Sequence, residues 1–263
     1  MNQALWIAKT GLDAQQTRMS VVSNNLANVN TNGFKKGRAV FEDLIYQTIR
    51  QPGAQATQEA QLPSGLMLGA GVRTVATEKL FGQGGFVQTE NSLDMAIEGR
   101  GFFQILMPNG ELGYTRDGTF QLNANGEVVM SNGYALQPGL VVPENTQAIT
   151  VGKDGTVTAQ LPDQAAPVQL GNIQLADFIN PAGLQPVGEN LYLETAASGA
   201  AQQANPGQNG VGSVLQGALE TSNVNMAEEL VNMIETQRAY EVNSKAIAAA
   251  DSMLQFVNNN LAR

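Results

Sequence analysis

The chain has 263 residues, of which 43% are hydrophobic and 14% charged, and its formal net charge is −9. This length suffices to bury a substantial core in one or two domains. Cysteine and histidine are both absent, which excludes thiolate nucleophiles, serine–histidine–aspartate triads and zinc or haem sites built on those residues. The acidic balance argues against a nucleic-acid partner, because phosphate binding needs clustered lysine and arginine. No apolar run approaches the roughly 18 residues of a membrane span, and residues 1–12 do not resemble a cleaved secretory signal.

The N-terminal segment carries apolar and small residues in alternating steps of three and four. The set is Leu5, Ala8, Leu12, Gln15, Met19, Val22, Leu26 and Val29. This heptad spacing predicts a helix over residues 1–30, about 40 Å long at roughly 1.5 Å per residue, with one narrow apolar stripe. The asparagine-rich stretch 28–33 follows and should end the helix, because asparagine and glycine favour turns and left-handed conformations.

The middle of the chain lacks a helical period. Residues 31–71 are predicted to form an extended arm or hairpin, because residues 51–71 are rich in glutamine, alanine, glycine and proline. Residues 72–221 are predicted to form a β-rich outer domain, with strands near 72–80, 93–97, 102–107, 119–122, 127–130, 148–151, 156–159, 168–178 and 191–194. Hairpin turns are expected at Asn109-Gly110, Asp117-Gly118, Asn125-Gly126, Asn132-Gly133 and Asp154-Gly155, and residues 198–212 are predicted to be a polar loop or linker. Such short strands are typical of an antiparallel sandwich or barrel.

The C-terminal segment, residues 222–263, repeats the helical pattern. Ser222 or Asn223 is a candidate N-cap, and Glu228 and Glu229 complement the helix dipole in the first turns. The expected fold class is therefore α+β, in which N- and C-terminal helices pair as a coiled-coil-like domain. The arm and a mainly antiparallel β domain are inserted between them.

The apolar stripes have two interpretations, since neither helix would be stable alone in water. One is a helical hairpin that covers an end of the β domain within one molecule. The other is a bundle between molecules, which the narrow stripes and the amide-rich outer positions favour. The predicted subunit-interface residues are Leu5, Leu12, Met19, Val22, Leu26, Met226, Leu230, Met233, Tyr240, Ile247, Leu254, Val257 and Leu261.

Motifs for small-molecule chemistry are weak. The glycine-rich segments 82–85 and 99–101 complete neither phosphate-binding pattern and precede no helix. Four carboxylates of the β region (Asp94, Glu98, Glu111 and Asp117) lack the flanking aromatics of a glycosidase cleft, and a solvated or ion-paired role is favoured for them. We therefore predict no catalytic residue, no cofactor, no metal and no small-molecule substrate.

A short basic cluster follows the asparagine-rich stretch: Lys35, Lys36 and Arg38. It is too small to bind nucleic acid in so acidic a chain. Pairing with carboxylates of a neighbouring subunit and a solvated turn are equally good interpretations, and both stay open.

Several segments resemble one known family. Residues 23–35, SNNLANVNTNGFK, are similar to the N-terminal signature of bacterial flagellar rod and hook proteins, although many members have proline where this chain has Asn32. Residues 93–103 and 114–120 resemble the start and first hairpin of the family's β domain, and residues 222–230 and 235–241 resemble its closing helix. The signature residues that we single out are Asn24, Asn25, Ala27, Asn28, Thr31, Gly33, Phe34 and Lys35.

The resemblance extends over nearly the whole chain, and the length, the 46–65 arm and the closing helix are most similar to the distal-rod branch. It implies a non-enzymatic subunit of the flagellar basal body that self-assembles into a helical tube and transmits torque across the periplasm. It also implies export by the flagellar type III apparatus, and contacts with proximal-rod, hook, peptidoglycan-ring and outer-membrane-ring proteins. The alternatives are another axial protein (proximal rod or hook) or, from a different class, a β-rich cell-wall-binding module.

Overall fold

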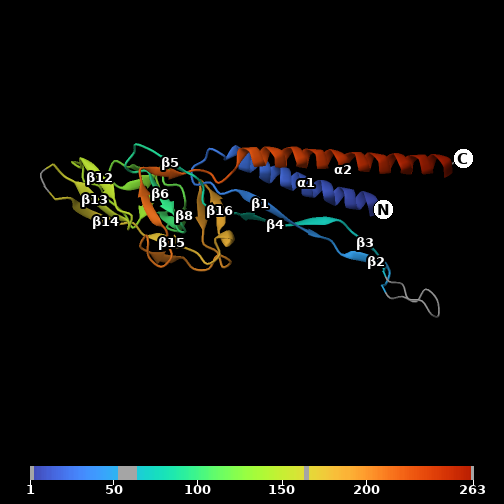
Figure 1. Cartoon of the computed structure of the whole chain (residues 1–263), viewed down its shortest axis with the longest axis horizontal. Coiled ribbons are helices and arrows are strands. Elements are labelled where there is room, and N and C mark those ends of the chain that lie inside the picture. Colours follow the sequence, from blue (N-terminus) through green and yellow to red (C-terminus); the bar gives the residue numbers. More distant parts are fainter. Residues whose placement is uncertain (1–2, 53–63, 163–165, 262–263) are drawn as a thin grey trace. The chain divides into compact units, whose positions relative to one another are not determined.

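The computed structural model describes residues 3–52, 64–162 and 166–261, and its fold is α+β, as predicted (Figure 1). Helix α1 (Gln3–Ala27) and helix α2 (Met226–Leu261) flank a long run of β-strands. The chain divides into two compact units. One contains the chain up to Leu26, Gly37–Glu78 and the segment from Met226 onward, and the other contains Ala27–Lys36 and Lys79–Asn225.

The first unit combines the two helices with the arm. Strand β1 (Gly37–Asp43) pairs with β4 (Val72–Lys79), and β2 (Tyr46–Arg50) pairs antiparallel with β3 (Leu66–Gly69). The Val72 amide donates to the Thr10 hydroxyl at 3.3 Å, which ties this ribbon to α1. Part of the predicted arm, residues 53–63, lies outside the described residues.

The contact between the helices is more polar than the stripes suggest. Among the side chains that the structure describes, the buried residues of α2 are Glu229, Thr236 and Ala250, and those of α1 are Ala14, Val22 and Asn25. The α2 set repeats in multiples of seven, as one position of a coiled-coil heptad does. Hydrogen bonds cross the contact from Asn25 to Glu229 and from Arg18 to Asn232, each at 3.3 Å. The buried side chains of the two helices are therefore mostly small or polar. Four apolar residues of the α2 stripe stay exposed: Met226, Leu230, Tyr240 and Leu254.

The second unit is a β body whose largest sheet has nine strands in the order β16-β17-β8-β7-β11-β10-β9, with β15 beside β7 and β18 beside β15. These strands are β7 (Phe102–Leu106), β8 (Leu112–Thr115), β9 (Phe120–Leu122), β10 (Val128–Met130), β11 (Ala135–Gln137), β15 (Leu175–Asp177), β16 (Gln185–Gly188), β17 (Leu191–Leu193) and β18 (Gln202–Ala204). A second sheet contains β12 (Ala148–Val151), β13 (Thr156–Gln160) and β14 (Val168–Asn172). Two further pairs join β6 (Met95–Glu98) to β19 (Ser213–Gln216) and β5 (Phe86–Gln88) to β20 (Ala218–Glu220), and a short 3-10 helix, η1, spans Pro181–Gly183.

Strand β7 separates two apolar cores because its side chains alternate between its faces. Phe103 and Ile105 belong to the larger core, whereas Phe102 belongs to a smaller aromatic one. In the smaller core Phe102 meets Phe178 edge to face, with the ring centroids 5.8 Å apart. Tyr192 completes this cluster, and burial raises its pKa to about 12.

Four of the five predicted hairpin turns are confirmed. Asn109-Gly110 joins β7 to β8, and the others join β9 to β10, β10 to β11, and β12 to β13. The prediction at Asp117-Gly118 is wrong, because β8 and β9, on either side of it, are not neighbours in the sheet. Gly118 instead permits a close approach of backbone, since a Cβ there would lie 1.5 Å from the carbonyl oxygen of Met95.

Three further expectations need correction. The predicted strand 168–178 is two strands, β14 and β15, which lie in different sheets. The predicted loop 198–212 contains strand β18, which pairs with β15 through backbone bonds that do not require apolar side chains. Helix α2 begins only at Met226, so neither predicted N-cap precedes it directly. The Asn223 side chain instead accepts from the Lys36 amide at 2.7 Å and donates to the Leu80 carbonyl at 2.8 Å, and the Ser222 hydroxyl accepts from the Val224 amide at 3.3 Å.

Candidate functional site

Asn25, one of the signature residues of segment 23–35, connects helix α1 to strand β1 and to helix α2. Its side chain is 2% exposed and pairs with the backbone of Gly37 as a neighbouring strand would. Oδ1 accepts from the Gly37 amide at 2.8 Å, and Nδ2 donates to the Gly37 carbonyl at 2.9 Å. Asn25 also donates to Glu229 of α2. One amide side chain thus fixes β1 against both helices.

The turn after α1 is held by local bonds and one glycine. The Thr31 amide donates to the Asn28 carbonyl at 3.2 Å, and the Thr31 hydroxyl donates to Asn28 Oδ1 at the same distance. Gly33 has φ +68°, and a Cβ there would lie 2.6 Å from the backbone carbon of Arg116. Its amide donates to the Glu220 carbonyl at 2.8 Å. Glycine is required because both the backbone conformation and the space exclude a side chain.

Lys35 is a fully buried cation. Its Nζ lies 2.6 Å from Glu220 Oε1 and 2.9 Å from the carbonyl oxygen of Gly82. Arg116 Nη1 lies 3.3 Å from the other oxygen of Glu220, and Arg116 Nη2 donates to the Gly99 carbonyl at 2.8 Å. We call these three side chains the Lys35–Glu220–Arg116 cluster.

This cluster holds two cations and one carboxylate away from water. Desolvation lowers the pKa of Lys35 and that of Arg116, and the negative charge of Glu220 opposes both shifts. The carbonyls of Gly82 and Gly99 share the excess positive charge. The cluster joins the segment that leads from α1 to the segment that leads into α2, within the β body.

Neither interpretation of the basic cluster holds for Lys35, which is buried with a carboxylate of its own chain. Arg38 is exposed and pairs with Glu78 of the same arm. No local signal reveals Glu220 as the partner of Lys35, since 185 positions separate them in the sequence.

Other signature residues lie on either side of this turn. Asn24 and Ala27 are exposed on α1. Phe34 is buried, and the Lys79 ammonium lies 4.2 Å from its ring centroid, an arrangement that favours a cation–π contact.

The predicted subunit-interface residues differ in exposure. Four are exposed: Met226, Leu230, Tyr240 and Leu254. Six are half-buried: Leu5, Leu12, Met19, Leu26, Met233 and Ile247. Val22 is buried within its own unit, and the side chains of Val257 and Leu261 lie outside the described residues.

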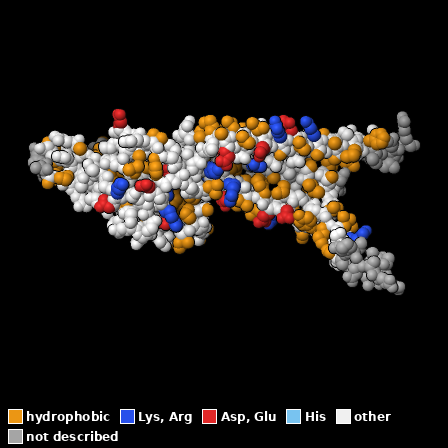
Figure 2. Space-filling view, viewed as in Figure 1, with side chains coloured by type: hydrophobic (Ala, Val, Ile, Leu, Met, Phe, Trp, Pro, Cys, Tyr) orange, Lys and Arg blue, Asp and Glu red, His pale blue; other side chains and the backbone are white. Residues whose placement is uncertain are grey.

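The exposed apolar surface of the helices is wider than the predicted stripe. Further exposed side chains are Trp6, Ile7, Val231, Ile234, Val242, Met253 and Phe256. Figure 2 shows apolar side chains along the visible face of α2, interrupted by charged ones of both signs. Isolated apolar residues are normal on a surface, but a contiguous apolar face marks an interaction site. The helix faces, rather than a cleft, are therefore the candidate functional surface.

The described part of the chain holds no group of three or more acidic side chains placed to bind a metal ion. The carboxylates considered above serve local structure there: Asp94 accepts from Asn91, and Asp117 accepts from the amide and hydroxyl of Thr119. Among the described helices, none is both long and apolar enough to cross a membrane.

Three family models match the sequence. The model for a flagella basal body rod protein matches residues 5–35, and the flagellar hook protein FlgE/F/G D1 domain matches residues 96–159. The flagellar basal body rod FlgEFG protein C-terminal model matches residues 215–260. Each member of the Lys35–Glu220–Arg116 cluster lies in a different matched segment.

Relatives named flagellar basal-body rod protein FlgG are similar along nearly their whole length. The protein of Buchnera aphidicola subsp. Schizaphis graminum is 55% identical over 97% of this chain and 98% of its own. That of Borreliella burgdorferi is 48% identical over 98% of each chain. That of Bacillus subtilis is 36% identical over 98% of this chain and 99% of its own.

Proposed function

Because the chain belongs to the flagellar rod and hook family, we propose that it is the structural subunit of the distal rod. Its copies assemble into a helical tube in the basal body, which spans the periplasm and transmits torque from motor to hook. Its role is structural rather than enzymatic.

The observation that supports this function best is that one face of α2 is buried within the molecule while another face exposes apolar side chains. The buried positions, such as Glu229 and Thr236, contact the same molecule, whereas Leu230 and Leu254 are exposed. In a dilute molecule the apolar face would remain in water. In a tube of packed helices it would be covered by other subunits. We propose that the predicted interface residues that are exposed or half-buried form these contacts.

The free energies of backbone ordering and apolar burial imply that such assembly is cooperative. Ordering a residue's backbone costs about 1–2 kcal/mol, and fully burying one leucine contributes roughly 1.5–3 kcal/mol. Many apolar contacts must therefore form together before a helix end is stably held. Addition at the end of an existing tube, where several neighbours are already in place, is favoured over pairing of free subunits.

The partners follow from the position of a distal rod. We propose contacts with the proximal rod and hook at the two ends, and with the peptidoglycan-ring and outer-membrane-ring proteins around it. Export would proceed through the flagellar type III apparatus. Residues 51–71 of the arm would brace neighbouring subunits and keep the tube straight.

The test is assembly of the full-length chain, examined by electron microscopy. Leu254→Asp places a charge on the exposed face of α2 and should abolish tube formation while the near-ultraviolet circular dichroism of the β body stays unchanged. Leu254→Met retains apolar area and serves as the matched control, which should assemble. Normal tubes from Leu254→Asp would contradict the proposed role of this face.

A further inference from the structure

Two surfaces of the β body carry apolar side chains that its cores leave exposed or only partly covered. Strands β9 and β16 form opposite ends of the order in the nine-stranded sheet. One surface is a pocket beside β9 and β12, and the other is a projecting loop beside β16. In Figure 1, β12 and β16 lie at different ends of the β body.

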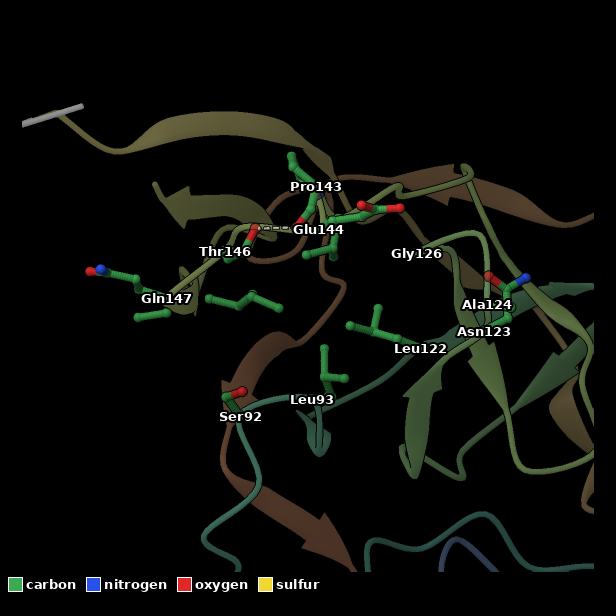
Figure 3. A pocket seen from close by; sticks show the side chains of 13 residues that line it. Ser92, Leu93, Leu122, Asn123, Ala124, Gly126, Pro143, Glu144, Thr146 and Gln147 are labelled. Atoms are coloured by element: carbon green, nitrogen blue, oxygen red, sulfur yellow. Dashed lines mark hydrogen bonds between the residues drawn. The ribbon is translucent and has the colours of Figure 1, made fainter. Parts of the chain in front are cut away.

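The pocket has a volume of about 450 Å³. Leu93, Leu122 and Ile149 contribute apolar surface, and Leu122 is 42% exposed. Figure 3 shows the leucines facing the space, with Glu144 and Thr146 on its other side. The pocket thus offers an apolar floor beside one carboxylate.

The edge of β12 beside this pocket is already covered. The Gln216 side chain donates to the Ile149 carbonyl at 2.8 Å and accepts from the Val151 amide at 3.0 Å. These are the groups that an added strand would use. A partner is therefore expected to insert a side chain here rather than add a strand.

The loop at the other end presents such a side chain. Ile179 is 78% exposed, although it follows Phe178, which is buried in the aromatic core. Asn180, the next residue, donates to the Ala197 carbonyl at 3.0 Å and holds the loop on its far side. Ile179 therefore projects from a base that is fixed on both sides.

A cation lies next to this isoleucine. Arg100 Nη2 lies 3.2 Å from the Phe178 carbonyl oxygen and 3.2 Å from Asp177 Oδ2, and most of its side chain is exposed. One end of the β body thus carries an apolar knob beside the Arg100–Asp177 ion pair, in which most of the arginine side chain is exposed, and the other an apolar pocket with a glutamate.

We propose that Ile179 of one copy inserts into the Leu93–Leu122–Ile149 pocket of another copy and places Arg100 beside Glu144. The inference rests on the proposed function, because an open helical assembly needs contacts between two different surfaces of each subunit. A second copy is the occupant because one chain supplies both the knob and the pocket, with opposite charges. The contact links the β bodies independently of the helix faces.

Disulfide trapping tests this contact directly, since the natural chain has no cysteine. Cells would produce the double variant Ile179→Cys/Ala124→Cys or Ile179→Cys/Ala148→Cys, where Ala124 and Ala148 line the pocket. After oxidation of isolated basal bodies, at least one double variant should give a ladder of covalent dimers, trimers and longer chains. Each single-cysteine variant should give none. Val87→Cys/Ala124→Cys, whose first site is exposed elsewhere on the body, is the matched control.

The outcomes separate this inference from the proposed function. If the chain is absent from isolated rods, the proposed function fails. If rods contain the cysteine variants but neither double variant forms a ladder, this contact is refuted and the rod function stands. Dimers from a single-cysteine variant would indicate a symmetric contact and would also refute it.

A charge exchange gives a second readout. Arg100→Glu and Glu144→Arg should each reduce the number of rods per cell about tenfold, because each change places like charges opposite each other across the contact. The double variant should restore the number to within about twofold. Thermal unfolding of each purified variant checks that the β body is still folded. If the double variant gave no more rods per cell than the single variants, the Arg100–Glu144 pairing would be contradicted.

Discussion

Substitutions in the Lys35–Glu220–Arg116 cluster should destabilise the β body to different extents, depending on which residue is replaced. Glu220→Gln removes the negative charge and leaves two cations facing each other in a buried site. An uncompensated buried charge typically costs about 3–5 kcal/mol. Lys35→Met instead leaves one arginine and one glutamate, which balance.

The remaining contacts keep the cost of Lys35→Met small. Glu220 still accepts from the Gly84 amide at 2.8 Å, and the Gly82 carbonyl still accepts from Asn223 at 3.0 Å. The loss is therefore about two hydrogen bonds from a charged donor, each worth roughly 1.5–3 kcal/mol, and the relief from burying an ammonium, several kcal/mol, offsets most of it. We expect Glu220→Gln to cost at least about 2 kcal/mol more than Lys35→Met.

Urea unfolding of the β body, followed by near-ultraviolet circular dichroism of its aromatic core, measures this difference. At a slope of about 2 kcal/mol per molar urea, the two midpoints should differ by about 1 M. Arg38→Met, which breaks an exposed ion pair, is the control and should cost at most about 1 kcal/mol. If Lys35→Met proved as costly as Glu220→Gln, the charge-balance reasoning would be refuted.

Three further predictions address the turn, the aromatic core and the arm. Gly33→Ala should destabilise the β body by about 2 kcal/mol or more, and clearly more than Gly110→Ala. Both glycines have positive φ, but only Gly33 of the two lacks room for a Cβ. Equal losses of stability in urea unfolding would contradict this reasoning. The raised pKa of Tyr192 means that the unfolded chain loses its phenol proton first, so stability should fall as the pH rises from about 10 to about 12. The fall should be smaller by up to roughly 2–3 kcal/mol in Tyr192→Phe, and identical pH profiles would refute the assignment. Deletion of residues 51–63 should lower the bending stiffness of isolated rods in electron micrographs, and an unchanged stiffness would remove the bracing role of the arm.

Local patterns predicted the elements that local physics determines. The heptad steps from Leu5 to Leu26 identified α1, and Asn-Gly or Asp-Gly pairs with positive φ identified four hairpins. Strands such as β19 and β20 were not predicted because they are three or four residues long and pair with β6 and β5, which lie more than a hundred positions earlier in the chain. Their formation depends on the partner strand more than on their own sequence.

The functional surface was partly predictable for a similar reason. Spacing along α2 identified apolar residues such as Leu230 and Leu254 but not which face the helix turns toward α1. That choice depends on polar partners, above all Asn25 with Glu229, which lie 204 positions apart. The burial of Lys35 was not predicted for the same reason: its partner Glu220 lies 185 positions away, and a charged side chain in a turn is normally exposed to solvent.

The polar seam between α1 and α2 also bears on mechanical load. Two helices joined only by interchangeable apolar contacts can slide along each other, since each step brings similar surfaces together. Here a displacement of one turn, about 5.4 Å, would separate Arg18 from Asn232 and Asn25 from Glu229, and would leave the buried Asn25 and Glu229 side chains unmatched. Specific amide and carboxylate partners thus set a single register, and a shaft built from such subunits resists axial slippage inside each subunit.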